Sequence, residues 1–373
     1  MQFIIQKFKN DTILFLSGIF AFISCFFVHP DFQYIKYINY PVLAILFSLM
    51  LIVSAMMRIG TFDFLTNKIL EKIHSERYIA ILFVLLSFFM SMFLTNDVTL
   101  VCLIPFAIMV LNKISDNHEL MITLIIMTVA SNLGSMFTPI GNPQNLYLYS
   151  TYNMKMIDFL NLMLPYSIIS LVLSILFVFW ENKNKKTEDD IVKNDVLKPN
   201  IYKLCIYIVL FILCIVTVSG QVNFLIMLFV VSSVILCMDY KAFKNADYSL
   251  LLTFVFFFIL IGNIGRIDFI HSMISQLIQK NIVLTAIFSS QIISNVPTAI
   301  LLSAFTENGK ALIVGTNLGG LGTIIASMAS LITYKFYIKL DENRKKGENY
   351  ILSFSTVNII FLVVLYIVYI FLK

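Results

Sequence analysis

Long apolar runs separated by short polar segments make up most of the 373-residue chain. A helix needs about 20 mostly apolar residues to cross a bilayer. The runs that reach or approach this length are 12–28, 41–57, 156–180, 203–218, 222–238, 249–264 and 350–372. Alternating segments of about ten residues, typical of membrane β-barrels, are absent from the sequence. The pattern therefore predicts an all-α polytopic membrane protein, since helices satisfy their own backbone hydrogen bonds inside lipid.

The composition supports this prediction. Hydrophobic residues make up 59% of the chain, the mean hydropathy is +0.90, and 13% of residues are charged, against about 25% in soluble domains. The first apolar run follows Lys7 and Lys9, as in a signal peptide, but no small-residue cleavage site follows it. We therefore expect this run to be a retained span.

Three polar landmarks of the first half recur in the same order in the second half. The pairs are "GTFDFL" (60–65) with "GRIDFI" (265–270), "LTNDVT" (94–99) with "ISNVPT" (293–298), and "VASNLGSMFT" (129–138) with "VGTNLGGLGT" (314–323). Their offsets are 205, 199 and 185, so the order is kept while the intervening loops shorten. We interpret residues 1–180 and 203–373 as two repeats, divided by a charged cytoplasmic linker at 181–202.

The distribution of basic residues predicts the topology. If the N-terminus is cytoplasmic, all but six of the 26 Lys and Arg residues fall on the inner side. The six on the outer side are Lys36, Lys155, Arg266, Lys280, Lys310 and Lys373. With the C-terminus then outside, the run at 41–57 crosses inward and its counterpart at 249–264 crosses outward. The two repeats are therefore predicted to be inverted, an arrangement typical of secondary transporters.

Two apolar segments of the second repeat are too short to cross a membrane. Segments 282–293 and 296–306 have 12 and 11 residues, which span about 18 and 17 Å as helix. The hydrocarbon core is about 30 Å thick. We therefore predict a re-entrant hairpin over 282–306, with Ser294 and Asn295 at its tip.

The equivalent segments of the first repeat, 78–94 and 98–111, are longer and are also compatible with two ordinary spans. Only the repeat predicts that they form a hairpin over 78–111, entering from the cytoplasm. Its tip would consist of Thr95, Asn96 and Asp97.

Two further crossings, at 119–152 and 311–334, are predicted to be broken helices. Their polar interruptions are "SNLGSMFTPIGNPQNLYLYS" (131–150) and "TNLGGLGT" (316–323). Irregular backbone at membrane depth is tolerated only where protein or a watery cavity surrounds it. Asn142 is expected to cap a new half-helix that starts at Pro143.

The hairpin tips are expected to resemble these breaks, with Asn96 or Asp97 capping one helix and Asn295 capping another. Four half-helix N-termini, each with about half a positive charge, would then face one region. Such a site attracts anions without a buried Lys or Arg. Unwound carbonyls and Ser, Thr and Asn oxygens are also suited to a small cation such as sodium. The alternative is that the breaks serve helix packing only.

Asp97 is a second candidate feature of the first tip. An aspartate in the middle of a bilayer costs about 2.5–3.5 kcal/mol on insertion scales. A role in cation or proton coupling is therefore predicted, with a simple helix cap as the alternative reading.

Other chemistry receives little support from the sequence. The five cysteines lie in apolar runs without a Cys-x-x-Cys pair, and the four histidines are scattered near predicted helix ends. The sequence contains neither His-Glu-x-x-His nor Gly-x-Ser-x-Gly. We expect no enzyme, no cofactor and no metal centre apart from a coupling ion. The net charge of +5 is attributed to topology, so no nucleic-acid partner is expected.

The motifs "TND", "SNVPT", "NLGSMFTPIGNPQN" and "TNLGGLGT" resemble the ion transporter superfamily over nearly the whole chain. This superfamily includes divalent anion:sodium symporters, citrate-transporter-like permeases, arsenite-efflux permeases and one class of sodium/proton antiporters. The "GNPQN" form is most similar to the citrate-transporter-like and arsenite-permease branch. The resemblance implies a homodimer, with scaffold helices such as those in 12–57 and a moving transport domain that works as an elevator.

The resemblance also implies site residues. The first cation site would use Thr95, Asn96, Gly134 and Thr138, and the second would use Ser294, Asn295, Gly319 and Thr323. The substrate would contact Asn96, Asn142, Asn295 and Thr298. Dicarboxylate symporters carry Ser-Asn-Thr at both tips, whereas the tips here read Thr-Asn-Asp and Ser-Asn-Val. This difference leaves the choice between sodium and proton coupling open.

The sequence therefore predicts a cation-coupled transporter of small anions in the inner membrane, with di- and tricarboxylates as the favoured substrates. The alternatives are a sodium/proton antiporter that uses Asp97 and an efflux permease for arsenite or another oxyanion.

Overall fold

The computed structural model describes residues 12–62, 64, 75–182, 198–218, 220–338, 340 and 349–372. Most of the predicted linker and the basic N-terminal residues lie outside this part of the chain. The elements are α2 (Thr12–Phe27), α3 (Gln33–Tyr37), α4 (Tyr40–Arg58), α6 (Glu76–Leu94), α7 (Asn96–Ile114), α8 (Asn117–Ser135), α9 (Pro143–Thr151), α10 (Met156–Glu181), α11 (Ile201–Val218), α12 (Phe224–Asp239), α13 (Ala242–Asn245), α14 (Tyr248–Ile264), α15 (Asp268–Lys280), α16 (Ile282–Ile293), α17 (Asn295–Ser303), α18 (Gly309–Gly319), the 3-10 turn η1 (Ile324–Ala326), α19 (Met328–Tyr337) and α21 (Tyr350–Leu372).

Several described helices are long and apolar enough to cross a membrane. They are α4, α6, α7, α10, α11 and α21. The predicted runs at 41–57, 156–180 and 350–372 agree within one residue at each end with α4, α10 and α21. The prediction of an all-α polytopic membrane protein is therefore confirmed.

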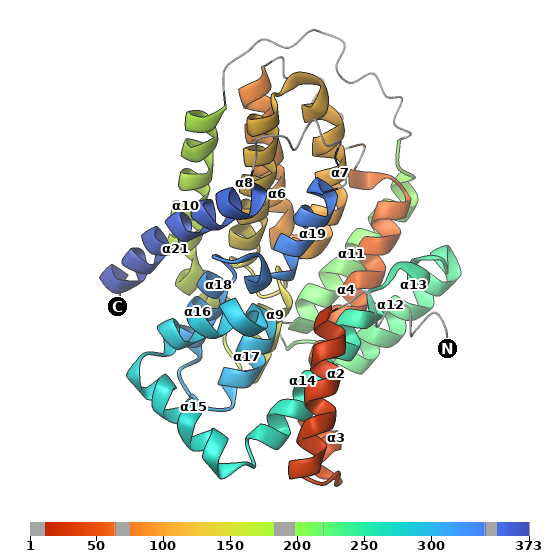
Figure 1. The fold of residues 1–373 in the computed structure, drawn as a ribbon. Helices are drawn as coiled ribbons and strands as arrows, with labels where there is room; N and C mark the ends of the chain where they lie inside the picture. Colours follow the sequence, from red (N-terminus) through yellow and green to blue (C-terminus); the bar gives the residue numbers. More distant parts are fainter. Residues whose placement is uncertain are drawn as a thin grey trace.

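Two pairs of helices are each joined by a single residue. Thr95 connects α6 to α7, and Ser294 connects α16 to α17. From these junctions the two pairs extend toward opposite ends of the molecule, one toward the start of α8 and the other toward α15 (Figure 1). The arms α16 and α17 have 12 and 9 residues, too few to cross a bilayer. The arms α6 and α7 have 19 residues each, so their length is also compatible with two full spans.

Two helices are interrupted at the predicted places. Residues 136–142 separate α8 from α9, and residues 320–327, which include η1, separate α18 from α19. The interruptions begin later than predicted, because Ser131–Ser135 and Thr316–Gly319 remain helical. Asn132 and Asn317 therefore project from the last turn of a regular helix.

The helices pack in two groups. In one group α6 packs on α8 and α16 packs on α18, while in the other α14 packs on α2 and α12 packs on α4. A ring contact of 5.7 Å between Tyr147 of α9 and Phe258 of α14 lies where the groups meet. The polar junctions and breaks described above all belong to the first group.

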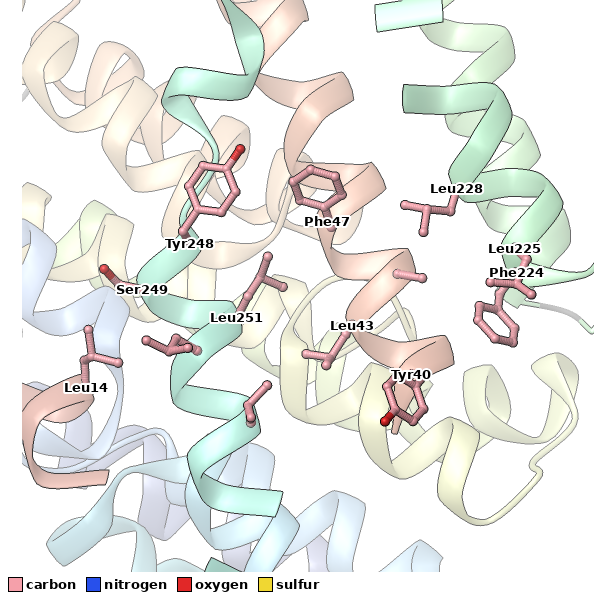
Figure 2. A pocket seen from close by; sticks show the side chains of 13 residues that line it. Leu14, Tyr40, Leu43, Phe47, Phe224, Leu225, Leu228, Tyr248, Ser249 and Leu251 are labelled. Atoms are coloured by element: carbon pink, nitrogen blue, oxygen red, sulfur yellow. The ribbon is translucent and has the colours of Figure 1, made fainter. Parts of the chain in front are cut away.

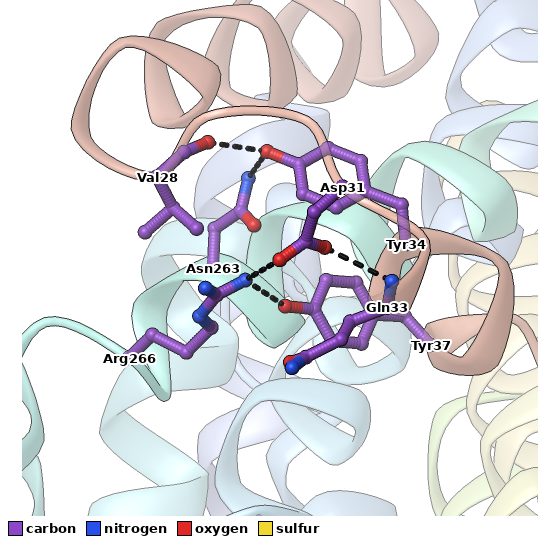
Figure 3. Close-up of polar contacts among 7 residues, drawn as sticks. All are labelled: Val28, Asp31, Gln33, Tyr34, Tyr37, Asn263 and Arg266. Atoms are coloured by element: carbon purple, nitrogen blue, oxygen red, sulfur yellow. Dashed lines mark hydrogen bonds and ion pairs between the residues drawn. The ribbon is translucent and has the colours of Figure 1, made fainter.

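A network of polar contacts fastens the loop after α2 to the end of α14 (Figure 3). Asn263 donates to the hydroxyl of Tyr34 at 2.8 Å, and Arg266 donates to Asp31 at 2.9 Å and to Tyr37 at 3.2 Å. The aromatic ring of Tyr37 lies against Gly262, where a methyl group would approach it to 2.3 Å. These contacts hold α2, α3 and α14 together as part of the second group.

Candidate polar site between the helix breaks

The two junction residues have the same unusual backbone. Thr95 has φ 71° and ψ 151°, and Ser294 has φ 72° and ψ 157°. This region is almost restricted to glycine, and a residue held there stores about 1–3 kcal/mol of strain. The shared geometry turns the chain sharply, so that α7 and α17 each start directly beside the end of the preceding helix.

The predicted side-chain caps at these junctions are wrong. Helix α7 begins at Asn96 and helix α17 begins at Asn295, and neither N-terminus has a side-chain cap. The Asn96 amide instead donates to Asn132 at 2.9 Å, which is a tertiary contact. Asp97 does not cap α7 either. The cap predicted at the first break is confirmed, since Asn142 accepts from the backbone N–H of Asn145 at 2.9 Å ahead of Pro143.

The residues of the predicted first cation site lie around the end of α6. A methyl group on Gly134 would lie 2.1 Å from the carbonyl oxygen of Phe88, so α8 touches α6 backbone to backbone. The hydroxyl of Thr138 donates to the carbonyl oxygen of Met92. Thr95 directly follows the last residue of α6, and the carbonyl oxygen of Asn96 accepts from Ser131 Oγ of α8 at 3.1 Å. The structure therefore brings Thr95, Asn96, Gly134 and Thr138 into one neighbourhood.

The predicted second cation site has a corresponding arrangement around the end of α16. A methyl group on Gly319 would lie 2.5 Å from Ser290 Oγ, and one on Gly320 would lie 2.8 Å from Asn295 Nδ2. Ser294 Oγ donates to the carbonyl oxygen of Ala326 at 3.4 Å. The backbone N–H of Thr323 donates to Gln291 Oε1 at 2.9 Å. Ser294, Asn295, Gly319 and Thr323 are therefore also neighbours.

Two asparagines that the sequence analysis missed connect the halves. Asn132 Oδ1 accepts from Ser327 Oγ at 3.0 Å, and Asn317 Oδ1 accepts from Asn142 Nδ2 at 3.1 Å. Ser327 and Asn142 are the residues that precede α19 and α9. Each asparagine thus contacts the start of the second half-helix of the opposite repeat. The signal in the sequence was their shared place in "SNLG" and "TNLG", which are 185 residues apart.

Side-chain amides donate hydrogen bonds to the backbone carbonyl oxygens at both helix breaks. Asn145 Nδ2 donates to the carbonyl oxygens of Met136 at 3.2 Å and Thr138 at 3.3 Å. Gln291 Nε2 donates to those of Gly319 at 3.1 Å and Leu321 at 2.9 Å. Both interruptions are therefore built features of the protein interior, since their irregular backbone is paired.

Several buried polar atoms in this region have no hydrogen-bond partner among the described residues. They are Asp97 Oδ1, Thr99 Oγ1, Asn132 Nδ2, Gln144 Oε1 and Thr298 Oγ1. Thr99 and Thr298 are separated by 199 residues and so occupy equivalent positions in the two hairpin motifs. Buried polar groups are nearly always paired, and exceptions in a native structure call for an explanation such as a ligand or ion.

A cavity of about 780 Å³ lies elsewhere, between α2, α4, α12 and α14. Its lining is almost entirely apolar, with Leu43, Phe47 and Leu251 facing it and Tyr40 and Tyr248 beside it (Figure 2). This cavity shares no lining residue with the polar site. Among the described residues no group of His, Cys, Asp or Glu side chains is placed to hold a metal ion.

The comparison with protein families agrees with the geometry. A family model described as "Citrate transporter" matches residues 1–311. The chain belongs to the citrate transporter family. An uncharacterized transporter of Methanocaldococcus jannaschii is 33% identical over 361 residues, which cover 96% of this chain and 97% of that protein. The inner membrane protein YbiR of Escherichia coli is 29% identical over 306 residues, covering 80% of each chain.

Another relative matches a smaller part of the chain. A putative transporter arsB of Dictyostelium discoideum is 27% identical over 150 residues, which cover 40% of this chain and 26% of that protein. The resemblance predicted from the motifs is confirmed by the family match. The protein is therefore a multi-pass membrane transporter of the citrate transporter family.

Proposed function

We propose that this transporter moves small anions, with di- and tricarboxylates as the favoured substrates, in a step coupled to Na⁺ or H⁺. The observation that carries the proposal is the meeting of α7, α9, α17 and α19 at one polar site. Asn132 contacts the first residue of α7 and the residue before α19. The backbone N–H of Asn96 donates to the carbonyl oxygen of Gly141, just before α9, and α17 packs on α9. Helix N-termini carry partial positive charge and favour anions.

The substrate residues in this proposal are Asn96, Asn142, Asn295 and Thr298. All are at least 96% buried, so an anion bound there would be shielded from water and would feel the helix dipoles at low dielectric. Hydroxyl and amide groups bind carboxylates without the desolvation cost of a buried Lys or Arg. The unpartnered hydroxyl of Thr298 supports a ligand at this position.

The coupling ion would bind at the two junctions. Thr95, Asn96, Gly134 and Thr138 would supply oxygen ligands at the first, and Ser294, Asn295, Gly319 and Thr323 at the second. Oxygen ligands of this kind suit a hard cation. Asp97 would add a carboxylate to the first site alone, where it binds the cation or carries a proton.

Movement would follow an elevator scheme in a homodimer. The group of helices with the polar site would slide past the group of α2, α4, α12 and α14, with Tyr147 and Phe258 at the boundary. The two repeats would be inverted, with the hairpins entering from opposite sides. We place the protein in the inner membrane with the N-terminus cytoplasmic and the C-terminus outside, following the distribution of basic residues.

A sodium/proton antiporter is a second candidate function, favoured by the buried, unpartnered carboxylate oxygen of Asp97. In that case Asp97 would exchange a proton for sodium and no organic substrate would bind. An efflux permease for arsenite or another oxyanion is a further variant, since a relative bears the name arsB.

Purified protein in liposomes separates these functions. Under an imposed sodium or proton gradient, uptake of radiolabelled citrate or succinate is expected above the rate in empty liposomes. Phosphate and arsenite serve as competing oxyanions, and a pH-sensitive dye reports proton flux. If sodium drives only proton movement and no anion enters, the anion-transport proposal is refuted in favour of the antiporter.

A further inference from the structure

The amide of Asn132 has an unused donor where two helix N-termini meet. Its Oδ1 accepts from Asn96 Nδ2 at 2.9 Å and from Ser327 Oγ at 3.0 Å. Asn96 is the first residue of α7, and Ser327 directly precedes α19. The side chain is 7% exposed, and its Nδ2 has no partner among the described residues. The amide is therefore held in place through its oxygen while its nitrogen is free to bind.

The equivalent asparagine of the second repeat differs in this respect. Asn317 Nδ2 donates to Asn145 Oδ1 at 2.6 Å and to the carbonyl oxygen of Ile313 at 2.8 Å. Its Oδ1 accepts from Asn142. Both ends of the Asn317 amide are therefore used within the protein, and this side chain has a structural role only.

We propose that Asn132 Nδ2 is a substrate ligand that donates a hydrogen bond to a carboxylate oxygen of the transported anion. This inference rests on the proposed anion transport and identifies the half of the site that holds the carboxylate. A buried amide donor without a partner is unfavourable, and an acceptor supplied by the substrate removes that cost. The positive ends of α7 and α19 strengthen the interaction, because they lie beside the two groups that position the amide.

The proposal makes the site asymmetric despite its repeated sequence. In the first repeat Asn132 Nδ2 has no partner among the described residues. In the second repeat the corresponding Asn317 Nδ2 donates to Asn145 Oδ1. One carboxylate group of the substrate would therefore be bound by the first repeat, through a hydrogen bond from Asn132. A symmetric anion such as succinate would bind with two unequal ends.

Asn132→Asp tests this directly. The substituted side chain has the same shape and still accepts from Asn96 and Ser327, but it replaces the donor with an anionic oxygen. The Michaelis constant for citrate or succinate uptake in liposomes is expected to rise about 10- to 100-fold, the range for a lost hydrogen bond to a charged group. The maximal rate is expected to change much less. Asn132→Ala, which lacks the donor without adding charge, should also raise the constant.

Two variants serve as matched controls. Asn358→Asp makes the same change at a fully buried asparagine of α21, whose Nδ2 donates to the carbonyl oxygen of Phe354, and should leave the Michaelis constant unchanged. Asn317→Asp should lower the thermal unfolding midpoint in detergent, because its donor bonds hold the protein itself.

The outcomes separate the two proposals. An unchanged constant in Asn132→Asp or Asn132→Ala refutes the ligand role while transport by the wild type stands. An equal rise in Asn358→Asp refutes it as well, since the effect is then not local. If the wild type neither transports nor is thermally stabilised by citrate, succinate, phosphate or arsenite, the anion proposal fails, and the role of Asn132 fails with it.

Discussion

The two hairpin junctions share a backbone but differ in their side chains. Thr95 and Ser294 differ by only one degree in φ and six in ψ. Yet the residue two positions later is Asp97 in the first junction and Val296 in the second. The closest contacts differ too. A methyl group on Gly134 would meet the backbone oxygen of Phe88 first, whereas one on Gly319 would meet Ser290 Oγ first.

This difference shows which part of a repeated structure is free to diverge. The sharp turn and the close approach of two helices are required in both halves, because without them the helix N-termini would not meet at one site. The side chains at the tip are free to specialise. The first half carries the carboxylate and the open amide, and the second half carries bonds that hold the protein together.

The largest expected effect comes from adding a methyl group where two helices touch at a glycine. Gly134→Ala would place a methyl group 2.1 Å from the Phe88 carbonyl oxygen, which is backbone and has no rotamer to change. We expect a loss of about 3 kcal/mol of stability, at the upper end of overpacking costs. Gly319→Ala meets Ser290 Oγ at 2.5 Å and Ser290 Cβ at 2.8 Å. Rotation can move the hydroxyl but not Cβ, so a smaller but still substantial loss of about 1–2 kcal/mol is expected. Thermal unfolding in detergent measures both.

A second substitution sharpens this contrast. Ser290→Ala removes the hydroxyl next to Gly319 and is expected to restore part of the stability of Gly319→Ala. Ser91→Ala, at the equivalent position in α6, leaves the Phe88 carbonyl in place and should not rescue Gly134→Ala. Equal rescue in both halves would contradict the distinction between a backbone contact and a side-chain contact.

Asp97→Asn is expected to have the next largest effect. Asp97 is half-buried, and one oxygen of its carboxylate is buried without a partner among the described residues. The amide replacement neither carries a proton nor attracts a cation. Gradient-driven uptake in liposomes should fall at least about 100-fold, equivalent to roughly 2.7 kcal/mol, while membrane insertion and the unfolding midpoint change little. Val296→Asn at the equivalent position serves as the control for polarity. Full coupling in Asp97→Asn would reduce this residue to a structural role.

Much of this arrangement was predictable from local pattern. The predicted segment 282–293 coincides with α16, and Pro143 begins α9 as expected. The length of an apolar run, and the effect of a proline or asparagine on a helix end, depend only on residues nearby in the sequence. The roles of Asn132 and Asn317 depend on residues 195 and 175 positions away. Such contacts arise only when the halves pack, so the shared place in "SNLG" and "TNLG" could point to these asparagines but not to their partners.

The capping errors have a related cause. An N-cap Asn accepts through Oδ1 from the backbone N–H of the second or third helical residue. Asn96 is already the first residue of α7, so its Oδ1 accepts only from the adjacent N–H of Asp97 at 3.0 Å, while its Nδ2 donates to Asn132. The left-handed junction also moves the N-cap position one residue earlier, to Thr95. The predicted segments 98–111 and 296–306 begin two residues and one residue after the observed starts of α7 and α17. The direction of the Asn96 side chain depends on the opposing helix α8, which carries Asn132.

The smallest expected effect tests whether the two junctions are equally strained. Thr95→Gly and Ser294→Gly would relieve about 1–3 kcal/mol of backbone strain, offset by about 0.5–1 kcal/mol of added entropy in the unfolded chain. Each variant is therefore expected to be stabilised by up to about 2 kcal/mol, with a small rise in unfolding midpoint of similar size in both. Because Thr95 and Ser294 are proposed cation ligands, sodium or proton dependence should weaken at the same time. If the unfolding midpoint rises in one variant and falls in the other, the two junctions are unequally strained despite their matching angles.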